Sequence, residues 1–223
     1  FPLAWSPACI GIASCVVDAS ACVPESRCYE TRAVIVDARN GRRLDDFAGA
    51  EGLNWSPNGR RMAWACDTDP DPYGEREAVC FTLNKGAPVQ RVEHAILNRP
   101  LWAPGGDRIA FIFEGQGTLR VLDVRRRSIR ALADPASSID GALTWSPDGR
   151  RLAYATATGE LFTVAATGER QRPRRVGRFS DASSPVWSPG GRRIAFLRRR
   201  LWTIRPDGTG ARRITSVVTH GLC

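Results

Sequence analysis

Several residue types and motifs are scarce or missing in this 223-residue chain. It has one lysine, Lys85, one methionine, and two histidines, His94 and His220. No apolar run approaches the roughly 18 residues that read as a membrane-spanning helix. The sequence contains no Gly-x-Ser-x-Gly, His-Glu-x-x-His or phosphate-binding loop motif. We therefore predict a protein that is not an enzyme and has no catalytic residue, although carboxylates brought together by the fold remain a route to catalysis.

The basic residues are almost all arginine, and the net charge is +9. Arginine forms planar forks that match carboxylate and phosphate, so one interpretation is an anionic partner. The other is a GC-rich genome that places arginine wherever a surface needs charge. The chain begins at Phe1 without a signal-peptide pattern, which suits either a mature processed protein or a trimmed piece.

Cysteine is abundant, but its spacing does not resemble a zinc site, and no Cys-x-x-Cys pair occurs. So many cysteines without a metal motif favour disulfides in an oxidising compartment. We predict an extracytoplasmic protein, either periplasmic, secreted or at the cell surface. The seven cysteines are Cys9, Cys15, Cys22, Cys28, Cys66, Cys80 and Cys223.

One ten-residue pattern recurs along the chain. Four copies align without gaps, a degenerate fifth copy opens the sequence, and their first tryptophans are 50, 47, 43 and 42 residues apart. A period of about 40–45 residues is typical of propeller blades. The copies cover residues 5–14, 55–64, 102–111, 145–154 and 187–196.

Each part of the pattern has a structural explanation. The tryptophan ends a first strand, and Ser-Pro-Asp-Gly makes a tight turn because glycine accepts a positive φ. Arg-Arg-Leu-Ala-Tyr predicts a second strand with alternating polar and apolar residues. A third strand follows, as at 201–204, and then a polar fourth strand, as at 212–215. The repeat therefore predicts four antiparallel strands, A to D.

The copy at 145–154, and the stretch Leu-Trp-Thr-Ile-Arg-Pro-Asp-Gly that begins at Leu201, resemble the repeat of the TolB-like, WD-repeat-like β-propellers. The resemblance covers nearly the whole chain. It implies an all-β propeller, commonly periplasmic or extracellular, that docks proteins on its faces. The founding member of that family has a further N-terminal domain that nothing here matches, so its cell-envelope role is not carried over.

Counting repeats predicts a single propeller of five four-stranded antiparallel blades over residues 1–223. The expected blades are approximately 1–50, 51–98, 99–141, 142–183 and 184–223. The residues after the last tryptophan and before the first add up to about one more repeat, which favours a closed ring. The rival interpretation is five repeats taken from a longer array.

Strand alternation places the A–B and C–D turns on one face, the bottom, and the B–C loops and D–A connections on the other, the top. Six cysteines then belong to the top face. We predict a Cys66–Cys80 disulfide, Cys15–Cys28 by analogy with it, and Cys22–Cys223 across the ends of the chain. Cys9, in the degenerate A–B turn, is left unpaired or pairs between chains.

Two top-face segments are candidate partner sites. The first is the acidic loop that contains Asp67, Asp69, Asp71 and Tyr73, and the second is the B–C connection Arg198, Arg199 and Arg200. Alternating aspartates also raise a calcium hypothesis for residues 67–75. Against it, Pro72 and Ala78 stand where an EF-hand loop needs Gly and Glu, so a proline-stiffened acidic loop is the simpler interpretation.

The other arginine runs are assigned to different elements, so the sequence does not predict one polyanion-binding surface. Arg125–Arg127 fall in a C–D turn, whereas Arg172, Arg174, Arg175, Arg212 and Arg213 fall on outer strands. Charged outer strands discourage edge-to-edge pairing. Basic residues interleaved with aromatics, as in nucleic-acid binders, are not found, so no nucleic acid is expected.

The sequence thus predicts a non-catalytic binding module that docks a protein partner on the loop-rich top face and needs no cofactor. One alternative is a lectin-like propeller that binds carbohydrate or a polyanion in aromatic or arginine pockets between blades. Another is a structural surface protein that assembles through its blades or Cys9.

Overall fold

The structure, a computed structural model, describes residues 3–5, 11–17, 31–37, 39–48, 50–66, 78–83, 88–93, 100–113, 117–133, 139–168, 171–177 and 179–214. The chain divides into two compact units, Phe1–Trp102 and Ala103–Cys223. The described residues form strands and turns, and they include no helix long and apolar enough to cross a membrane.

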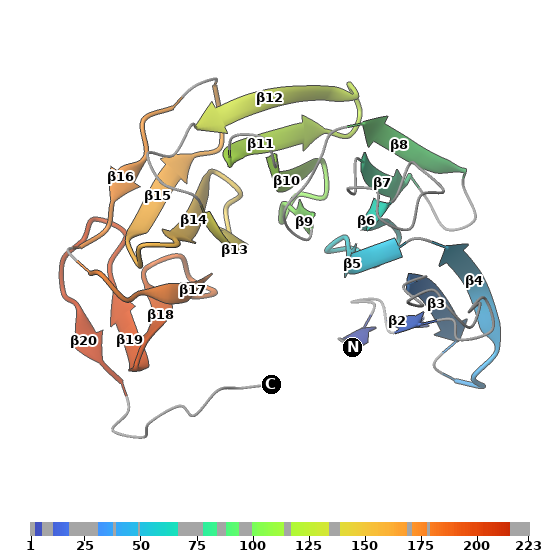
Figure 1. The fold of residues 1–223 in the computed structure, drawn as a ribbon, viewed down its shortest axis with the longest axis horizontal. Helices are drawn as coiled ribbons and strands as arrows, with labels where there is room; N and C mark the ends of the chain where they lie inside the picture. Colours follow the sequence, from blue (N-terminus) through green and yellow to red (C-terminus); the bar gives the residue numbers. More distant parts are fainter. Residues whose placement is uncertain are drawn as a thin grey trace, which may run out of the picture. The chain divides into compact units, whose positions relative to one another are not determined.

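The described strands form five four-stranded antiparallel sheets, each in the order of the sequence, and we call them blades one to five (Figure 1). Blade one contains β1 (Leu3–Trp5), β2 (Gly11–Val17), β3 (Thr31–Asp37) and β4 (Arg43–Ala48). Blade two contains β5 (Ala50–Trp55), β6 (Met62–Cys66), β7 (Ala78–Thr82) and β8 (Val89–Glu93). Blade three contains β9 (Leu101–Trp102), β10 (Arg108–Phe113), β11 (Thr118–Asp123) and β12 (Ser128–Ala133). Blade four contains β13 (Ile139–Trp145), β14 (Arg151–Thr156), β15 (Leu161–Ala165) and β16 (Arg174–Arg175). Blade five contains β17 (Ser183–Trp187), β18 (Ile194–Arg198), β19 (Arg200–Ile204) and β20 (Arg212–Arg213).

The recurring pattern positions the first turn of blades two to five as predicted. In all five blades the first strand ends at the tryptophan of the pattern. In blades two to five the glycine N–H of the turn donates to the carbonyl oxygen three residues earlier, at 2.8 Å in each case. The φ angles of these glycines, Gly59, Gly106, Gly149 and Gly191, are 65°, 68°, 65° and 67°. Glycine is needed because other residues resist this conformation.

The second strands of blades two, three and four differ from the expected alternation, because they are buried along almost their whole length. The side chains of β6 are all buried, and in β14 only the first residue, Arg151, is exposed. In blade four, β14 pairs with β13 and β15 and also packs against β17 of the next blade. Successive side chains of a strand point to opposite faces, so the unbroken burial after Arg151 shows that both faces of β14 are covered. A strand buried on both faces is apolar throughout instead of alternating.

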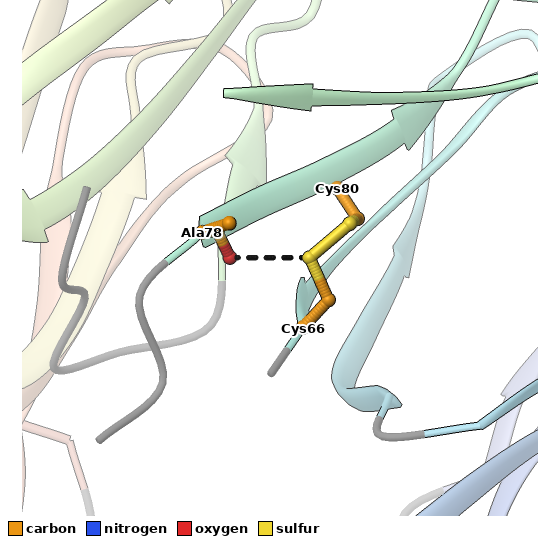
Figure 2. Close-up of a disulfide and its surroundings, with 3 residues drawn as sticks. All are labelled: Cys66, Ala78 and Cys80. Atoms are coloured by element: carbon orange, nitrogen blue, oxygen red, sulfur yellow. Dashed lines mark hydrogen bonds between the residues drawn. A yellow bond between two sulfur atoms is a disulfide. The ribbon is translucent and has the colours of Figure 1, made fainter. Parts of the chain in front are cut away.

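The predicted disulfide between Cys66 and Cys80 is confirmed (Figure 2). Cys66 is in register with Ala78 and Cys80 with Trp64, so the bridge crosses diagonally between β6 and β7. The two Cα atoms are 5.8 Å apart, and both cysteines are buried in the core of the first unit. Cys15 lies within β2 opposite Ala33. The predicted Cys15–Cys28 and Cys22–Cys223 bridges, and Cys9, depend on residues outside the described ranges.

The second unit has its own apolar core under blades four and five. Phe179 and Phe196 meet with their ring centres 4.8 Å apart, and Trp187 is buried beside them with 8% of its surface exposed. The tryptophan that ends the first strand of blade five is thus part of this core. The core holds the turns after β13 and β17 in place.

Candidate functional site

The bottom face of the second unit is made of the A–B and C–D turns of blades three to five. Within blade four, the N–H of Ala166 in the C–D turn donates to the carbonyl oxygen of Arg150 in the A–B turn, at 2.8 Å. The equivalent bond in blade three runs from Val124 to Asp107, at 3.0 Å. Each pair of turns therefore lies together at one end of its blade.

This face carries a concentration of positive charge. Seven exposed arginines occupy its turns and the first residue of β14, against three exposed aspartates, Asp107, Asp148 and Asp207. The sequence-based assignment of the arginine runs to different elements missed this, because turns far apart in the chain meet at the same end of neighbouring blades. The seven are Arg125, Arg126, Arg127, Arg150, Arg151, Arg192 and Arg205.

One arginine closes the junction between blades three and four. Arg108, the first residue of β10, donates from its guanidinium to the carbonyl oxygens of Gly149 at 3.0 Å and Ala166 at 3.2 Å. Its guanidinium carbon also lies 5.3 Å from the centre of the Trp145 ring. We call this arrangement the closed junction.

The next junction contains residues at the equivalent positions but is open. Trp145 pairs with Leu152 and Trp187 with Ile194, and this register makes Arg151, Trp187, Gly191 and Pro206 the counterparts of Arg108, Trp145, Gly149 and Ala166. In place of a closed contact there is a pocket of about 530 Å³. Its lining is Ser146, Pro147, Asp148, Arg151, Trp187, Pro189, Gly190, Gly191 and Pro206.

Arg151 differs from Arg108 in its surroundings. Its side chain is exposed, and its guanidinium makes no hydrogen bond or ion pair with the residues that the structure describes. The backbone N–H of Arg151 is held by the hydroxyl oxygen of Ser146 at 2.9 Å. The backbone of Arg151 is thus held in place by a hydrogen bond, whereas its guanidinium has no partner among the described residues.

Pro206 distinguishes the open junction from the closed one, because it removes a bond between the two turns of blade five. In blades three and four the residue at this position donates its N–H to the A–B turn, as Ala166 does to Arg150. A proline has no N–H to give, so this bond cannot form in blade five. The C–D turn of blade five closes instead between Arg205 and Thr209, and the blades are linked further out, where Arg174 donates to the carbonyl oxygen of Asp207 at 2.9 Å.

Asp148 adds a negative acceptor to the same pocket. It accepts from the hydroxyl of Ser146 at 2.6 Å and from the N–H of Arg150 at 3.0 Å. These two hydrogen bonds hold the pKa of Asp148 below its usual value. The pocket lining therefore includes an ionised carboxylate, a guanidinium and three prolines.

The predicted top-face arginines lie at the other end of blade five. Arg198 ends β18, where its Nε is 2.5 Å from Asp181 Oδ1 and its guanidinium carbon 5.5 Å from the Phe179 ring centre. Arg199 is exposed at the hairpin tip with a φ of 51°, and Arg200 begins β19. The remaining candidates lie outside the described ranges, and these are Asp67, Asp69, Asp71, Tyr73, the calcium hypothesis at 67–75, His94 and His220.

Of the predicted outer-strand arginines, four lie on the fourth strands of their blades and are exposed. Arg174 and Arg175 form β16, Arg212 and Arg213 form β20, and Arg172 precedes β16. Arg175 pairs with Glu160 at 2.9 Å. Arg125–Arg127 lie in the C–D turn of blade three, as expected.

No protein-family model matches the chain, and no curated protein matches it either. Among solved structures it is similar to one described as dihydro-heme d1 dehydrogenase NirN in complex with DHE. The TM-score is 0.68 and the identity 19%, over 98% of this chain but only 46% of that chain. An identity this low shows the fold alone, and it does not single out the TolB-like family. The five four-stranded sheets and this likeness together make the chain an all-β propeller of five blades.

Proposed function

We propose that the protein is a non-catalytic binding module, located outside the cytoplasm, whose bottom face holds an acidic polysaccharide. The observation that carries the proposal is the group of seven exposed arginines on the turns of three successive blades. An extended polyanion neutralised by several arginines releases its counterions, and this gives affinity without a deep site. The Cys66–Cys80 disulfide supports an oxidising compartment.

A glycan suits this face better than a simple anion because the pocket offers groups of both signs. The guanidinium of Arg151 attracts a carboxylate, whereas Asp148 requires a hydrogen-bond donor. Sugar acids supply both, since each ring carries a carboxylate and several hydroxyl groups. The predicted lectin-like alternative, with arginine pockets between blades, thus has specific structural support.

Docking of a protein partner on the top face is a second proposal, together with membership of the TolB-like family. It is supported by Arg199, which the hairpin between β18 and β19 presents at its exposed tip. The long loops that first suggested this face, at 16–27 and 67–78, fall largely outside the described ranges.

Titration calorimetry with polygalacturonate, at two salt concentrations, tests the first proposal. We expect binding that weakens markedly as salt is raised from 50 to about 200 mM, and no binding of an uncharged galactan of equal length. The double variant Arg125→Gln/Arg192→Gln removes two bottom-face charges and should bind more weakly with a smaller salt dependence. Its matched control, Arg212→Gln/Arg213→Gln, removes two charges from β20 and should bind like the wild type. Equal affinity for the neutral galactan, or no binding of the acidic one, would overturn the proposal.

A further inference from the structure

We propose that the pocket between blades four and five is a subsite for one uronic acid residue, whose carboxylate is bound by Arg151. This inference rests on the proposed function and specifies its central contact. It is drawn from the comparison of two equivalent junctions within the same chain.

The closed junction shows what a guanidinium at this position does. Arg108 donates to two carbonyl oxygens, stacks against Trp145 and lies 3.6 Å from the carboxylate of Asp107, so its charge is engaged within the protein. At the open junction Arg151 has the same neighbours in register, but no acceptor among the described residues reaches it. A carboxylate in the pocket would supply two oxygens in the planar geometry that a guanidinium prefers.

The lining excludes a ligand that offers acceptors only. Asp148 is ionised and already accepts two protein hydrogen bonds, so a phosphate or a bare carboxylate beside it would be repelled. A carboxylate has further acceptor positions, which the hydroxyl groups of a sugar would fill. One ring that carries a carboxylate on one side and hydroxyls on the other satisfies Arg151 and Asp148 together.

The pocket is large enough for a sugar ring. Its volume of about 530 Å³ falls within the range of small-molecule pockets. Pro147, Pro189 and Pro206 give it rigid apolar walls, against which the C–H face of a pyranose can pack. These prolines also limit the conformational entropy lost on binding, because their backbone is fixed before the ligand arrives.

The first test compares two arginines one blade apart. A galacturonate trimer is titrated into the wild type, Arg151→Gln and Arg192→Gln. The two variants lose the same charge on the same face, but only Arg151 lines the pocket. We expect a loss of affinity of at least about tenfold for Arg151→Gln and less than about threefold for Arg192→Gln. If the wild type binds polygalacturonate but both variants lose the same affinity for the trimer, the proposed subsite is wrong and the proposed function still stands.

The second test uses Asp148→Asn and a change of ligand. Asparagine is tolerated here, because Asn58 occupies the equivalent position in blade two and accepts from Ser56 Oγ at 2.8 Å. We expect Asp148→Asn to bind the galacturonate trimer more weakly but a penta-glutamate peptide more strongly than the wild type does. The opposite signs are expected because the sugar offers several hydroxyl groups that donate to Asp148, whereas the glutamate side chains offer only acceptors, which Asp148 repels.

The remaining outcomes are also decisive. Penta-glutamate could bind the wild type as tightly as the trimer does, and Arg151→Gln could weaken the binding of both equally. In that case the ligand is an acidic peptide and the sugar proposal is wrong. If neither polygalacturonate nor its trimer binds the wild type, both proposals are overturned. The urea midpoint of Arg151→Gln is measured alongside, and it should match the wild type because the guanidinium has no partner among the residues that the structure describes.

Discussion

The guanidinium of Arg108 lies over the ring of Trp145, at 5.3 Å from its centre, and this contact joins two neighbouring blades. The same group donates to carbonyl oxygens of the A–B and C–D turns of blade four. One side chain thus satisfies three groups on another blade. Its counterpart Arg151 satisfies none among the described residues, which separates a structural arginine from one available for binding.

Replacing Arg108 should therefore destabilise the protein, whereas replacing Arg151 should not. We expect Arg108→Gln to lower the free energy of unfolding by about 1.5–3 kcal/mol, because a charged donor and its stacking contact are lost. Arg151→Gln, with the same change of side chain, should stay within about 0.5 kcal/mol of the wild type. Urea unfolding followed by tryptophan fluorescence measures both. Similar losses in the two variants would contradict the distinction between the junctions.

Removing the disulfide should weaken the first unit. The bridge joins residues 14 apart in sequence, and a loop of that length contributes about 3 kcal/mol in the chain-entropy model. We expect Cys66→Ala/Cys80→Ala to lose roughly that amount in urea unfolding under non-reducing conditions. Peptide mapping of the unreduced wild type should recover the two cysteines in one cross-linked fragment. Finding both thiols free there would contradict the bridge.

Two glycines with similar backbone angles should respond very differently to alanine. Gly41 and Gly159 have φ angles of 70° and 77°. A Cβ on Gly41 meets nothing within 4 Å, whereas one on Gly159 overlaps the backbone of Ser180 and Asp181. We expect Gly41→Ala to cost about 1 kcal/mol from backbone strain, and Gly159→Ala about 3 kcal/mol or more from strain and overlap. Thermal unfolding of the two variants checks the order, and a larger loss for Gly41→Ala would be inconsistent with this packing.

Acid should destabilise the bottom-face turns through their aspartates. Hydrogen bonds from Ser146 and Arg150 lower the pKa of Asp148, and those from Thr209 lower the pKa of Asp207. A lowered folded-state pKa means that the unfolded chain binds protons first as the pH falls. The stabilisation is then complete above the unfolded pKa of about 3.9 and is lost as the pH drops through the folded value. Melting temperatures between pH 7 and 2 should show a shallower acid loss for Asp148→Asn than for the wild type.

The sequence predicted the strands and the first turns of each blade well, because Trp-Ser-Pro-Asp-Gly combines signals that act locally. The glycine requires a positive φ, and the tryptophan marks the end of the first strand. The Cys66–Cys80 bridge was also predictable, since both cysteines flank one loop between paired strands. Burial of the second strands on both faces was not predicted, because it depends on neighbouring blades.

The candidate site was harder to predict because its parts come from two blades. Arg151 lies in a pattern shared with three other copies, and the local difference from Arg108 is the preceding residue, which is Asp107 in one copy and Arg150 in the other. A further difference is Pro206, 55 residues away, which replaces Ala166 of the preceding blade. Aligning the third strands of successive repeats would have shown this difference. The clustering of arginines from three blades required the relative placement of the blades themselves.

The proline at 206 has a consequence for how a repeat protein acquires a new property. Duplication of a blade supplies several copies of the arginine that can join neighbouring blades, and each additional copy is partly redundant. At the junction with Pro206 the arginine is available for a ligand, while Arg108 continues to join blades three and four. The fold and the ligand contact can then be selected separately, although both are encoded by the same ten-residue motif.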